Sequence, residues 1–301
     1  LIKTWCLRGT LHTLAADDLP LMTGTFGEPC HRAVERDIMD ECGMNAVTWH
    51  RVEADVLNAL AGGPLDRVAL HAAVPALKAV PAAGWGDDVK GLAYQGDLIM
   101  VGSKGPRPVF ARRDQWLPDL HFRPHTRIKS IEELLLRYLA TFGPATLTDF
   151  SHWTGLSSAI VRETSARSDR LLEQVIVAGR SAPLLARAAD TDALTGPLPE
   201  APTVTLLPKF DAMTLAWKDP SRILDNGNRN AVFRPAGQIE AVVLLHGEAA
   251  ATWRVNRTTT TVSFTIAPVG SIGARARKQV DAAFEELGSW MGARTVHIAW
   301  P

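Results

Sequence analysis

The sequence predicts an α+β protein in which tandem winged helix-turn-helix units are followed by a β-rich C-terminal unit with a closing helix. One observation is a pattern that occurs twice, at about residues 49–112 and 126–190. In each copy, a helix that runs into Gly-Pro precedes two more helices and a β-hairpin. The other observation is a change after about residue 190, where the chain becomes mainly β from Val204 to Ile266. Tandem units of this kind favour a nucleic-acid partner.

The first repeat shows each element of the pattern. Its initial helix carries apolar residues from Val52 to Leu60 and meets Gly62-Gly63-Pro64. Asp66 is placed to cap the second helix, and Asp87 to cap the third. Residues 98–110 form two strand-like runs around a turn that contains Gly and Pro, so we expect them to form the wing.

Helix-start and helix-end signals define the second repeat more clearly. They are the capping boxes Ser130/Glu133 and Thr146/Asp149, Gly155 at a helix end and Ser157 at a helix start. A short wing is expected over residues 175–185, where Ala178-Gly179-Arg180 forms the turn.

The β-rich C-terminal unit is expected to contain a strand at 204–207, a hairpin over 240–255 and an alternating strand at 258–266. A closing amphipathic helix is expected over 271–292. Val280, Phe284, Leu287 and Trp290 are predicted on its apolar face, and Trp290 is therefore interpreted as a core residue.

The N-terminal region is expected to belong to a further, incomplete copy of the repeat. Residues 3–14 alternate like a strand, and residues 17–48 are interpreted as helices broken at Pro20, Gly24 and Gly27. Because the sequence opens in a strand without an initiating Met, we expect a natural segment upstream of it. The predicted segments are 1–48 (a winged-helix remnant with bridging helices), 49–125, 126–200 (both winged helices) and 201–301.

Composition indicates a globular protein without a membrane partner. The chain has 301 residues, of which 46% are hydrophobic and 21% charged, and no apolar run approaches the roughly 18 residues of a membrane span. Cys6, Cys30 and Cys42 form no CxxC or Cys/His spacing, so no metal and no cofactor are expected. Reduced thiols and the lack of a signal-peptide pattern favour the cytoplasm, and tandem units favour a monomer.

The net charge is zero, with 32 basic and 32 acidic residues, which by itself disfavours a nucleic-acid binder. The distribution is uneven, because residues 104–129 hold seven Lys or Arg and two acids. Four of these basic residues are candidate phosphate contacts of the first wing. They are Lys104, Arg107, Arg112 and Arg113.

Four ordered motifs carry a family resemblance. They are TWCLRGTLH at 4–12, YLATFGPATLTDFSHWTGL at 138–156, LLPKFDAMTLAWKDPSRIL at 206–224 and LLHGEAAATWR at 244–254. The chain resembles the winged-helix DNA glycosylases of the AlkZ/YcaQ type over nearly its whole length. That resemblance implies three tandem winged helices around a cleft for duplex DNA, an inserted β-hairpin, and hydrolysis of the N-glycosidic bond of alkylated purines, crosslinked ones included.

The resemblance also implies a catalytic Gln-apolar-Gln or Gln-apolar-Asp motif upstream of TWCLRGTLH. None of the five glutamines forms Gln-apolar-Gln, and Gln95-Gly96-Asp97 matches only the spacing of the second form, with Gly in the middle and in the wrong repeat. The catalytic residues are therefore unknown, and a monofunctional glycosylase activity is expected of the full-length protein.

Arg8 and His12 are interpreted as strand residues on one face, because residues two or four apart in a strand share a face. Arg8 would then contact phosphate, and His12 would lie near the base. The alternatives are a structural arginine bonded to carbonyls and a hydrogen-bonded core histidine.

Two further segments are candidates for DNA contact. Lys218 and Arg222 lie in a loop that is suited to phosphate. In residues 225–237 an Asn226-Gly227 turn precedes Arg229 and Arg234, which flank Phe233; such a basic hairpin with an apolar residue can enter a minor groove. The alternative is a solvated loop. Asp211 is interpreted as a turn cap.

The sequence thus predicts a DNA-repair glycosylase of bacterial type that acts on duplex DNA, possesses no metal site and possesses no cofactor. A non-catalytic winged-helix protein, such as a regulator or a damage sensor, is the main alternative. A scaffold that binds other proteins is a further alternative, because many winged helices bind protein.

Overall fold

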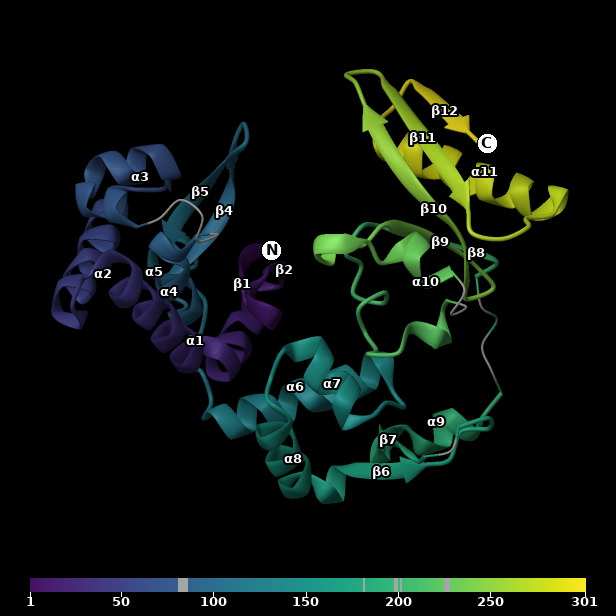
Figure 1. The fold of residues 1–301 in the computed structure, drawn as a ribbon, viewed down its shortest axis with the longest axis horizontal. Helices are drawn as coiled ribbons and strands as arrows, with labels where there is room; N and C mark the ends of the chain where they lie inside the picture. Colours follow the sequence, from purple (N-terminus) through teal and green to yellow (C-terminus); the bar gives the residue numbers. More distant parts are fainter. Residues whose placement is uncertain (81–85, 181, 198–199, 201, 225–227) are drawn as a thin grey trace. The chain divides into compact units, whose positions relative to one another are not determined.

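The computed structural model describes residues 1–80, 86–180, 182–197, 200, 202–224 and 228–301. These residues form two compact units (Figure 1). Unit 1 consists of Leu1–Thr141 and Thr154–Arg170, and unit 2 of Phe142–Trp153 and Leu171–Pro301.

Unit 1 is a helical body around a five-stranded sheet of order β2-β1-β4-β5-β3. Its strands are β1 (Ile2–Trp5), β2 (Leu11–Leu14), β3 (Leu65–Asp66), β4 (Leu98–Lys104) and β5 (Arg107–Arg112). Its helices are α1 (Leu19–Cys42), α2 (Ala46–Leu60), α3 (Arg67–Ala73), α4 (Asp87–Gln95), α5 (Arg113–Trp116), nearly all of α6 (Arg127–Phe142), and α8 (Ser158–Arg167).

The first repeat has the predicted order of elements. Helix α2 leads into β3, which pairs with β5 in the register Leu65↔Phe110, and α3, α4 and the β4–β5 wing follow. Asp66 caps α3 as expected, since its carboxylate accepts a hydrogen bond from the backbone N–H of Ala69 at 2.9 Å. Asp87 is the first residue of α4 rather than its cap, which is Gly86.

The N-terminal strand prediction is wrong in one respect, because residues 2–14 form a hairpin rather than a single strand. β1 and β2 pair antiparallel, with Thr4 opposite His12, and β1 also pairs with β4. The chain reverses at Arg8 and Gly9, whose φ angles of 52° and 70° are left-handed. Two such residues in succession end the alternation from which a continuous strand was predicted.

Helix α1 is continuous, which corrects the predicted breaks at Pro20, Gly24 and Gly27. Pro20 lies in the first turn, where its missing N–H has no helical partner to lose. The two glycines are instead sites of close packing. A Cβ at Gly24 would lie 2.9 Å from the carbonyl oxygen of His125, and one at Gly27 would lie 3.0 Å from that of Tyr94.

Ser130 explains a second correction. It lies inside α6 and is buried, so the predicted capping box with Glu133 does not form. Its hydroxyl fits against the space left by Gly24 and lies 3.5 Å from the carbonyl oxygen of His125. A small hydroxyl side chain in the middle of a helix therefore marks a helix crossing here and not a helix start.

Unit 2 contains nearly all of α7 (Leu147–Thr154), the strands β6 (Leu172–Val175) and β7 (Leu184–Arg187), and α9 (Thr191–Thr195). The Thr146/Asp149 capping box is confirmed, with both backbone N–H contacts at 3.0 Å. An isolated bridge pairs Ala145 with Leu185 of the wing, as β3 pairs with β5 in the first repeat.

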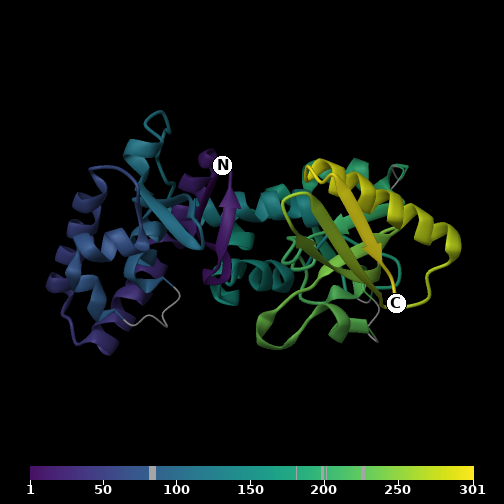
Figure 2. The same cartoon turned by 90° about the horizontal axis from the view of Figure 1, so that it is seen from above.

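The rest of unit 2 is built on a second five-stranded sheet of order β12-β11-β10-β9-β8. Its elements are β8 (Val204–Leu207), α10 (Arg229–Val232), β9 (Ala241–Leu245), β10 (Glu248–Arg257), β11 (Thr261–Pro268), α11 (Ala274–Trp290) and β12 (Thr295–Ala299). Helix α11 covers one face of the sheet through Val280 and Phe284, as the yellow helix in Figure 2 shows. Apolar residues of 213–224 and 232–233 pack against the other face.

Two features of this unit escape the sequence prediction. Strand β12 is short and half-exposed, and it pairs parallel with β11, so no run of apolar residues marks it. Trp290 is 83% exposed and not a core residue. It is the last residue of α11 and lies about 80° around the helix from the Val280–Phe284 stripe.

Replacing Gly24 tests the close packing of α1. We expect Gly24→Ala to lower the free energy of unfolding by about 1–3 kcal/mol, because the new Cβ overlaps Ser130 and the His125 carbonyl. Helix propensity alone would raise it by about 0.5–1 kcal/mol. Urea denaturation followed by circular dichroism measures the difference. Gly102→Ala, which meets no atom within 4 Å, is the matched control, and a Gly24→Ala protein as stable as wild type would refute the packing argument.

Candidate nucleic-acid interface

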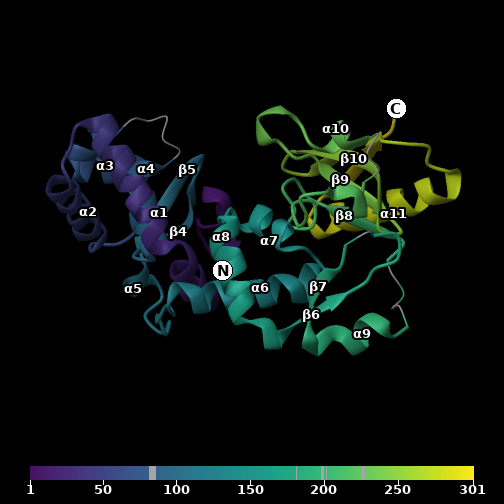
Figure 3. The ribbon, with the colours of Figure 1, turned by 60° about the horizontal axis from the view of Figure 1, so that its bottom comes forward.

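Helix α4 takes the place of the recognition helix in the first repeat, but α1 covers it (Figure 3). Val89, Leu92 and Tyr94 of α4 are buried, and a Cβ at Gly27 of α1 would lie 3.0 Å from the carbonyl oxygen of Tyr94. A Cβ at Gly91 would lie 3.1 Å from the ring of His31. In this repeat the tip of the wing is exposed and the third helix is covered, so the wing is the better candidate for contact with a nucleic acid.

Helix α8, the third helix of the second repeat, has an open polar face. Val161 and Thr164 are buried, whereas Ser158, Arg162 and Arg167 are exposed. Ser157 caps the helix as predicted and accepts a hydrogen bond from the N–H of Ile160, at 3.5 Å. This helix has the exposure that a groove-binding helix needs.

A cavity of about 410 Å³ lies at the start of α8 within unit 1. Arg8 and Arg127 line it together with Ser157. Its described lining residues include no Asp or Glu, so the cavity is electropositive. Burial lowers the pKa of the Arg8 guanidinium and raises that of the Cys6 thiol, which also lines the cavity, to about 12. The chemistry of these groups suits an anion and not a cation.

Arg8 and His12 are not two residues of one strand face. Arg8 lies in the β1–β2 turn, close to Gly155, where a Cβ would lie 3.2 Å from the Arg8 Cα. The Nε2 of His12 lies 2.9 Å from the Thr10 hydroxyl and 3.3 Å from the Leu7 carbonyl. Burial lowers the pKa of His12, which favours the neutral ring. His12 is therefore better interpreted as a hydrogen-bonded structural histidine than as a residue near the base.

The basic residues of the first wing divide into two groups. Lys104 and Arg107 are exposed partners at the wing tip, opposite each other in the β4–β5 register. Arg112 forms two hydrogen bonds with Asp114, at 3.0 and 2.7 Å. Arg113 donates to the Gly96 carbonyl at 2.9 Å and stacks on the ring of Phe122, and both contacts are structural. The predicted four-residue cluster is thus reduced to the two residues of the tip.

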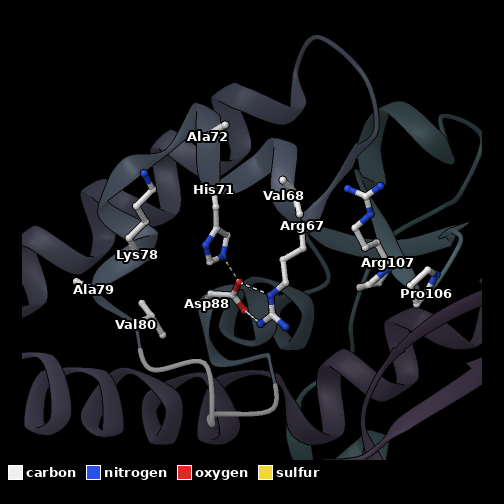
Figure 4. A pocket seen from close by; sticks show the side chains of 11 residues that line it. Arg67, Val68, His71, Ala72, Lys78, Ala79, Val80, Asp88, Pro106 and Arg107 are labelled. Carbon is white, nitrogen blue, oxygen red and sulfur yellow. Dashed lines mark hydrogen bonds and ion pairs between the residues drawn. The ribbon is translucent and has the colours of Figure 1, made fainter.

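A larger cavity of about 810 Å³ borders the same wing, with Arg107 and Lys78 among its lining residues. Figure 4 shows the buried Asp88 between Arg67 and His71 in this cavity. The Arg67 Nε donates to Asp88 at 2.8 Å, and the His71 Nε2 lies 2.7 Å from the same carboxylate. Asp88 therefore links α3 to α4 and raises the pKa of Arg67. The side chains of Arg67 and His71 both bond to the Asp88 carboxylate, which indicates a structural role for all three.

The 217–222 loop of unit 2 is fastened to the residues that precede α7. Trp217 Nε1 donates to the Phe142 carbonyl at 3.0 Å, and Arg222 donates to the Pro144 carbonyl at 2.5 Å. The backbone N–H of Lys218 donates to Asp149 at 2.9 Å, while its side chain is exposed. Lys218 therefore remains a candidate phosphate contact. Arg222 is better explained by its hydrogen bond to the Pro144 carbonyl.

The prediction of a basic hairpin over residues 225–237 is wrong for the part of this segment that the structure describes. Asn226-Gly227 lies outside the described residues, and residues 229–237 form α10 and a 3-10 turn instead of paired strands. Phe233 is half-buried against the core, so it is not the exposed wedge that was predicted. Arg229 is exposed and stacks on Phe233 at 4.9 Å, and the Arg234 Nε lies 3.8 Å from Glu240.

Several candidates were missed by sequence reasoning. Lys209 and Arg254 approach Glu240 with Arg234, and both stand in quoted motifs, LLPKFD and LLHGEAAATWR. Gln279-Val280-Asp281 also has the Gln-apolar-Asp pattern, although it lies far downstream of TWCLRGTLH. Its Val280 is fully buried and its Asp281 accepts a hydrogen bond from Trp300 at 2.7 Å, so it belongs to the core packing of α11.

In the part of the chain that the structure describes, no three His, Cys, Asp or Glu side chains are grouped so that they could hold a metal ion. No helix among the described residues has the length and apolarity needed to cross a membrane.

Comparison with known proteins agrees with this architecture. The interstrand DNA cross-link repair glycosylase of Streptomyces sahachiroi is 29% identical over 273 residues, which are 85% of this chain and 70% of that protein. The solved structure of the S. sahachiroi DNA glycosylase AlkZ matches with a TM-score of 0.81 at 22% sequence identity. The match covers 100% of this chain and 82% of the AlkZ chain. The predicted α+β fold is thereby confirmed.

The family assignment follows from the sequence itself. The family model described as DNA glycosylase AlkZ-like matches residues 1–290, which include all four motifs. This chain belongs to the AlkZ-like DNA glycosylase family.

Proposed function

We propose that the protein is a monofunctional DNA glycosylase that hydrolyses the N-glycosidic bond of alkylated purines in duplex DNA, including purines that crosslink the two strands. The observation that carries the proposal is the family match over residues 1–290. The name of the S. sahachiroi relative, an interstrand cross-link repair glycosylase, supports the crosslink activity.

The chemistry of the described groups is compatible with this reaction. An N-alkylated purine carries positive charge and leaves readily, so little general-acid catalysis is needed. The lining of the cavity at the start of α8 agrees with this, because its described residues offer guanidinium, hydroxyl and thiol groups and no carboxylate pair. Such a cavity suits a phosphate better than it suits acid–base chemistry.

The DNA contacts that we propose are spread along the chain. In unit 1 they are the exposed face of α8 with Arg162, Arg8 at the adjoining cavity, and Lys104 with Arg107 at the wing tip. In unit 2 they are Lys218, Arg229 at the start of α10 and Arg234 after that helix, all three exposed. Arg112, Arg113 and Arg222 are left out because their guanidinium groups are engaged within the protein.

A non-catalytic DNA-binding protein is the second candidate. The observation that favours it is the set of exposed cations at the wing tip and on α8, because they suit DNA binding whether or not a base is released. Both candidates share the same DNA contacts and differ only in base release.

Release of free base separates the two functions. We expect the protein to release 7-methylguanine from a duplex that contains it, measured as free base by mass spectrometry, because the charged base is a good leaving group. The same duplex without protein gives the spontaneous rate, and an unmodified duplex gives the background. Tight binding with release no faster than the spontaneous rate would establish the non-catalytic alternative.

Charge removal at the wing tip tests the DNA contacts. We expect Lys104→Ala/Arg107→Ala to weaken duplex binding and to reduce the slope of log K against log salt by about 1–2, since each phosphate contact adds about 1. The lower figure applies if Asp66, 3.7 Å from Arg107, already neutralises that residue. Fluorescence anisotropy at several salt concentrations measures the slope.

Arg36→Ala/Arg51→Ala removes the same charge from exposed positions of α1 and α2 and serves as the control. An equal loss of slope in both double variants would show that net charge, and not the wing tip, determines binding.

A further inference from the structure

Glu240 gathers three cations from distant parts of unit 2. Its carboxylate is 6% exposed and lies 2.8 Å from Arg254, 3.4 Å from Lys209 and 3.8 Å from Arg234. Lys209 lies in the loop after β8, Arg234 lies in the segment after α10, and Arg254 belongs to strand β10. We call Lys209, Arg234, Arg254 and Glu240 the Glu240 cluster.

The Glu240 cluster has more positive charge than its own carboxylate requires. Three cations against one anion leave a local charge of two, and the Arg254 guanidinium holds the pKa of Glu240 below its usual range, so the carboxyl stays ionised. The side chains of Lys209, Arg234 and Arg254 are 46%, 48% and 70% exposed. Their remaining N–H groups therefore face solvent and are available to an anion.

Phe210, the residue after Lys209, is held in an unusual conformation. The N–H of Asp211 donates to the Pro208 carbonyl at 3.2 Å, which places Phe210 third in a four-residue turn, and its φ is 60°. A turn of this kind favours Gly at that position. The ring is nevertheless 48% exposed, so core packing does not account for the choice of Phe.

Phe210 also differs from the other left-handed residues. Of the four described non-glycine residues with positive φ, Arg8, Ala236 and His246 each precede a glycine that is left-handed as well. Phe210 precedes Asp211, whose carboxylate braces the next turn by accepting from the N–H of Met213 at 2.8 Å. Backbone strain at an exposed aromatic residue is typical of a binding site.

We propose that Phe210 and the Glu240 cluster form a binding site for an unstacked nucleotide of DNA, in which the cations bind phosphate and the Phe210 ring stacks on the base. This site rests on the proposed function, because a glycosylase works on DNA in which a base has left the stack. A phosphate and a base plane side by side are what cations beside an aromatic ring recognise in single-stranded nucleic acid. An acidic protein segment would use the cations but would gain nothing from the ring.

Phe210→Gly is the decisive variant, because glycine relieves the strained turn while removing the ring. The probes are a fully paired duplex and the same duplex with one unpaired nucleotide, neither containing a lesion. We expect wild type to prefer the second duplex, and Phe210→Gly to lose about tenfold of that preference. Its melting temperature should be unchanged or higher. A structural role for Phe210 would instead lower the melting temperature and leave the preference intact.

Matched controls come from the same unit. Trp290→Ala removes an exposed aromatic ring from the end of α11, and Arg275→Gln removes an exposed cation from the same helix. Arg254→Gln should reduce the salt slope by about 1, and Arg275→Gln should not. Equal effects of Arg254→Gln and Arg275→Gln, or of Phe210→Gly and Trp290→Ala, would overturn the site. Displacement of both DNA probes by polyglutamate at equal charge concentration would favour an acidic protein partner and would also overturn it.

Measuring base release by the wild-type protein distinguishes failure of this site from failure of the proposed function. Wild-type release of 7-methylguanine with an unchanged Phe210→Gly preference would leave the glycosylase in place and remove the site. A lost preference without any base release by wild type would support the site on a DNA-binding protein and remove the enzyme.

Discussion

The arrangement of unit 1 depends on the close packing of helix α1 against α4 and α6, which glycine residues make possible. Gly27 brings α1 to the Tyr94 backbone of α4, Gly91 of α4 fits against the His31 side chain of α1, and Gly24 fits against Ser130 of α6 and the carbonyl of His125. Close approach of this kind fixes where each helix lies, because any side chain larger than hydrogen would force the helices apart. The cost is that α4 can no longer enter a DNA groove. The wing of the first repeat and helix α8 are what remain for binding.

The basic residues of the protein serve two purposes, holding the fold and attracting anions. The protein is neutral overall, and many of its arginines are used to hold the fold: Arg113 on Phe122, Arg222 on the Pro144 carbonyl and Arg67 on Asp88. Most of the 32 Lys and Arg residues nevertheless remain exposed, so what attracts an anion is how the exposed cations are grouped. Where a carboxylate gathers several of them, as Glu240 does, it reduces their repulsion and fixes their positions.

The sequence was sufficient for elements with local signals and insufficient for features that depend on tertiary contact. The Thr146/Asp149 and Asp66 caps could be predicted because a cap is formed within four residues. Gly24 and Ser130 were misinterpreted because a glycine and a serine that meet at a helix crossing look, in sequence, like a break and a cap. For the candidate site, Lys104 and Arg107 could be predicted from charge, whereas Lys209 and Arg254 meet only through folding of segments 45 residues apart.

Asp149 sets a limit on how far the two repeats are interchangeable. One of its oxygens caps α7, and the other accepts from the N–H of Lys218, while the carbonyls of Phe142 and Pro144 bind Trp217 and Arg222. Excising residues 126–200 would remove these acceptors and leave the 217–222 loop without its partners. The second repeat and the 217–222 loop therefore form one structural piece, and the repeat could not be exchanged for the first one without that loop losing its partners.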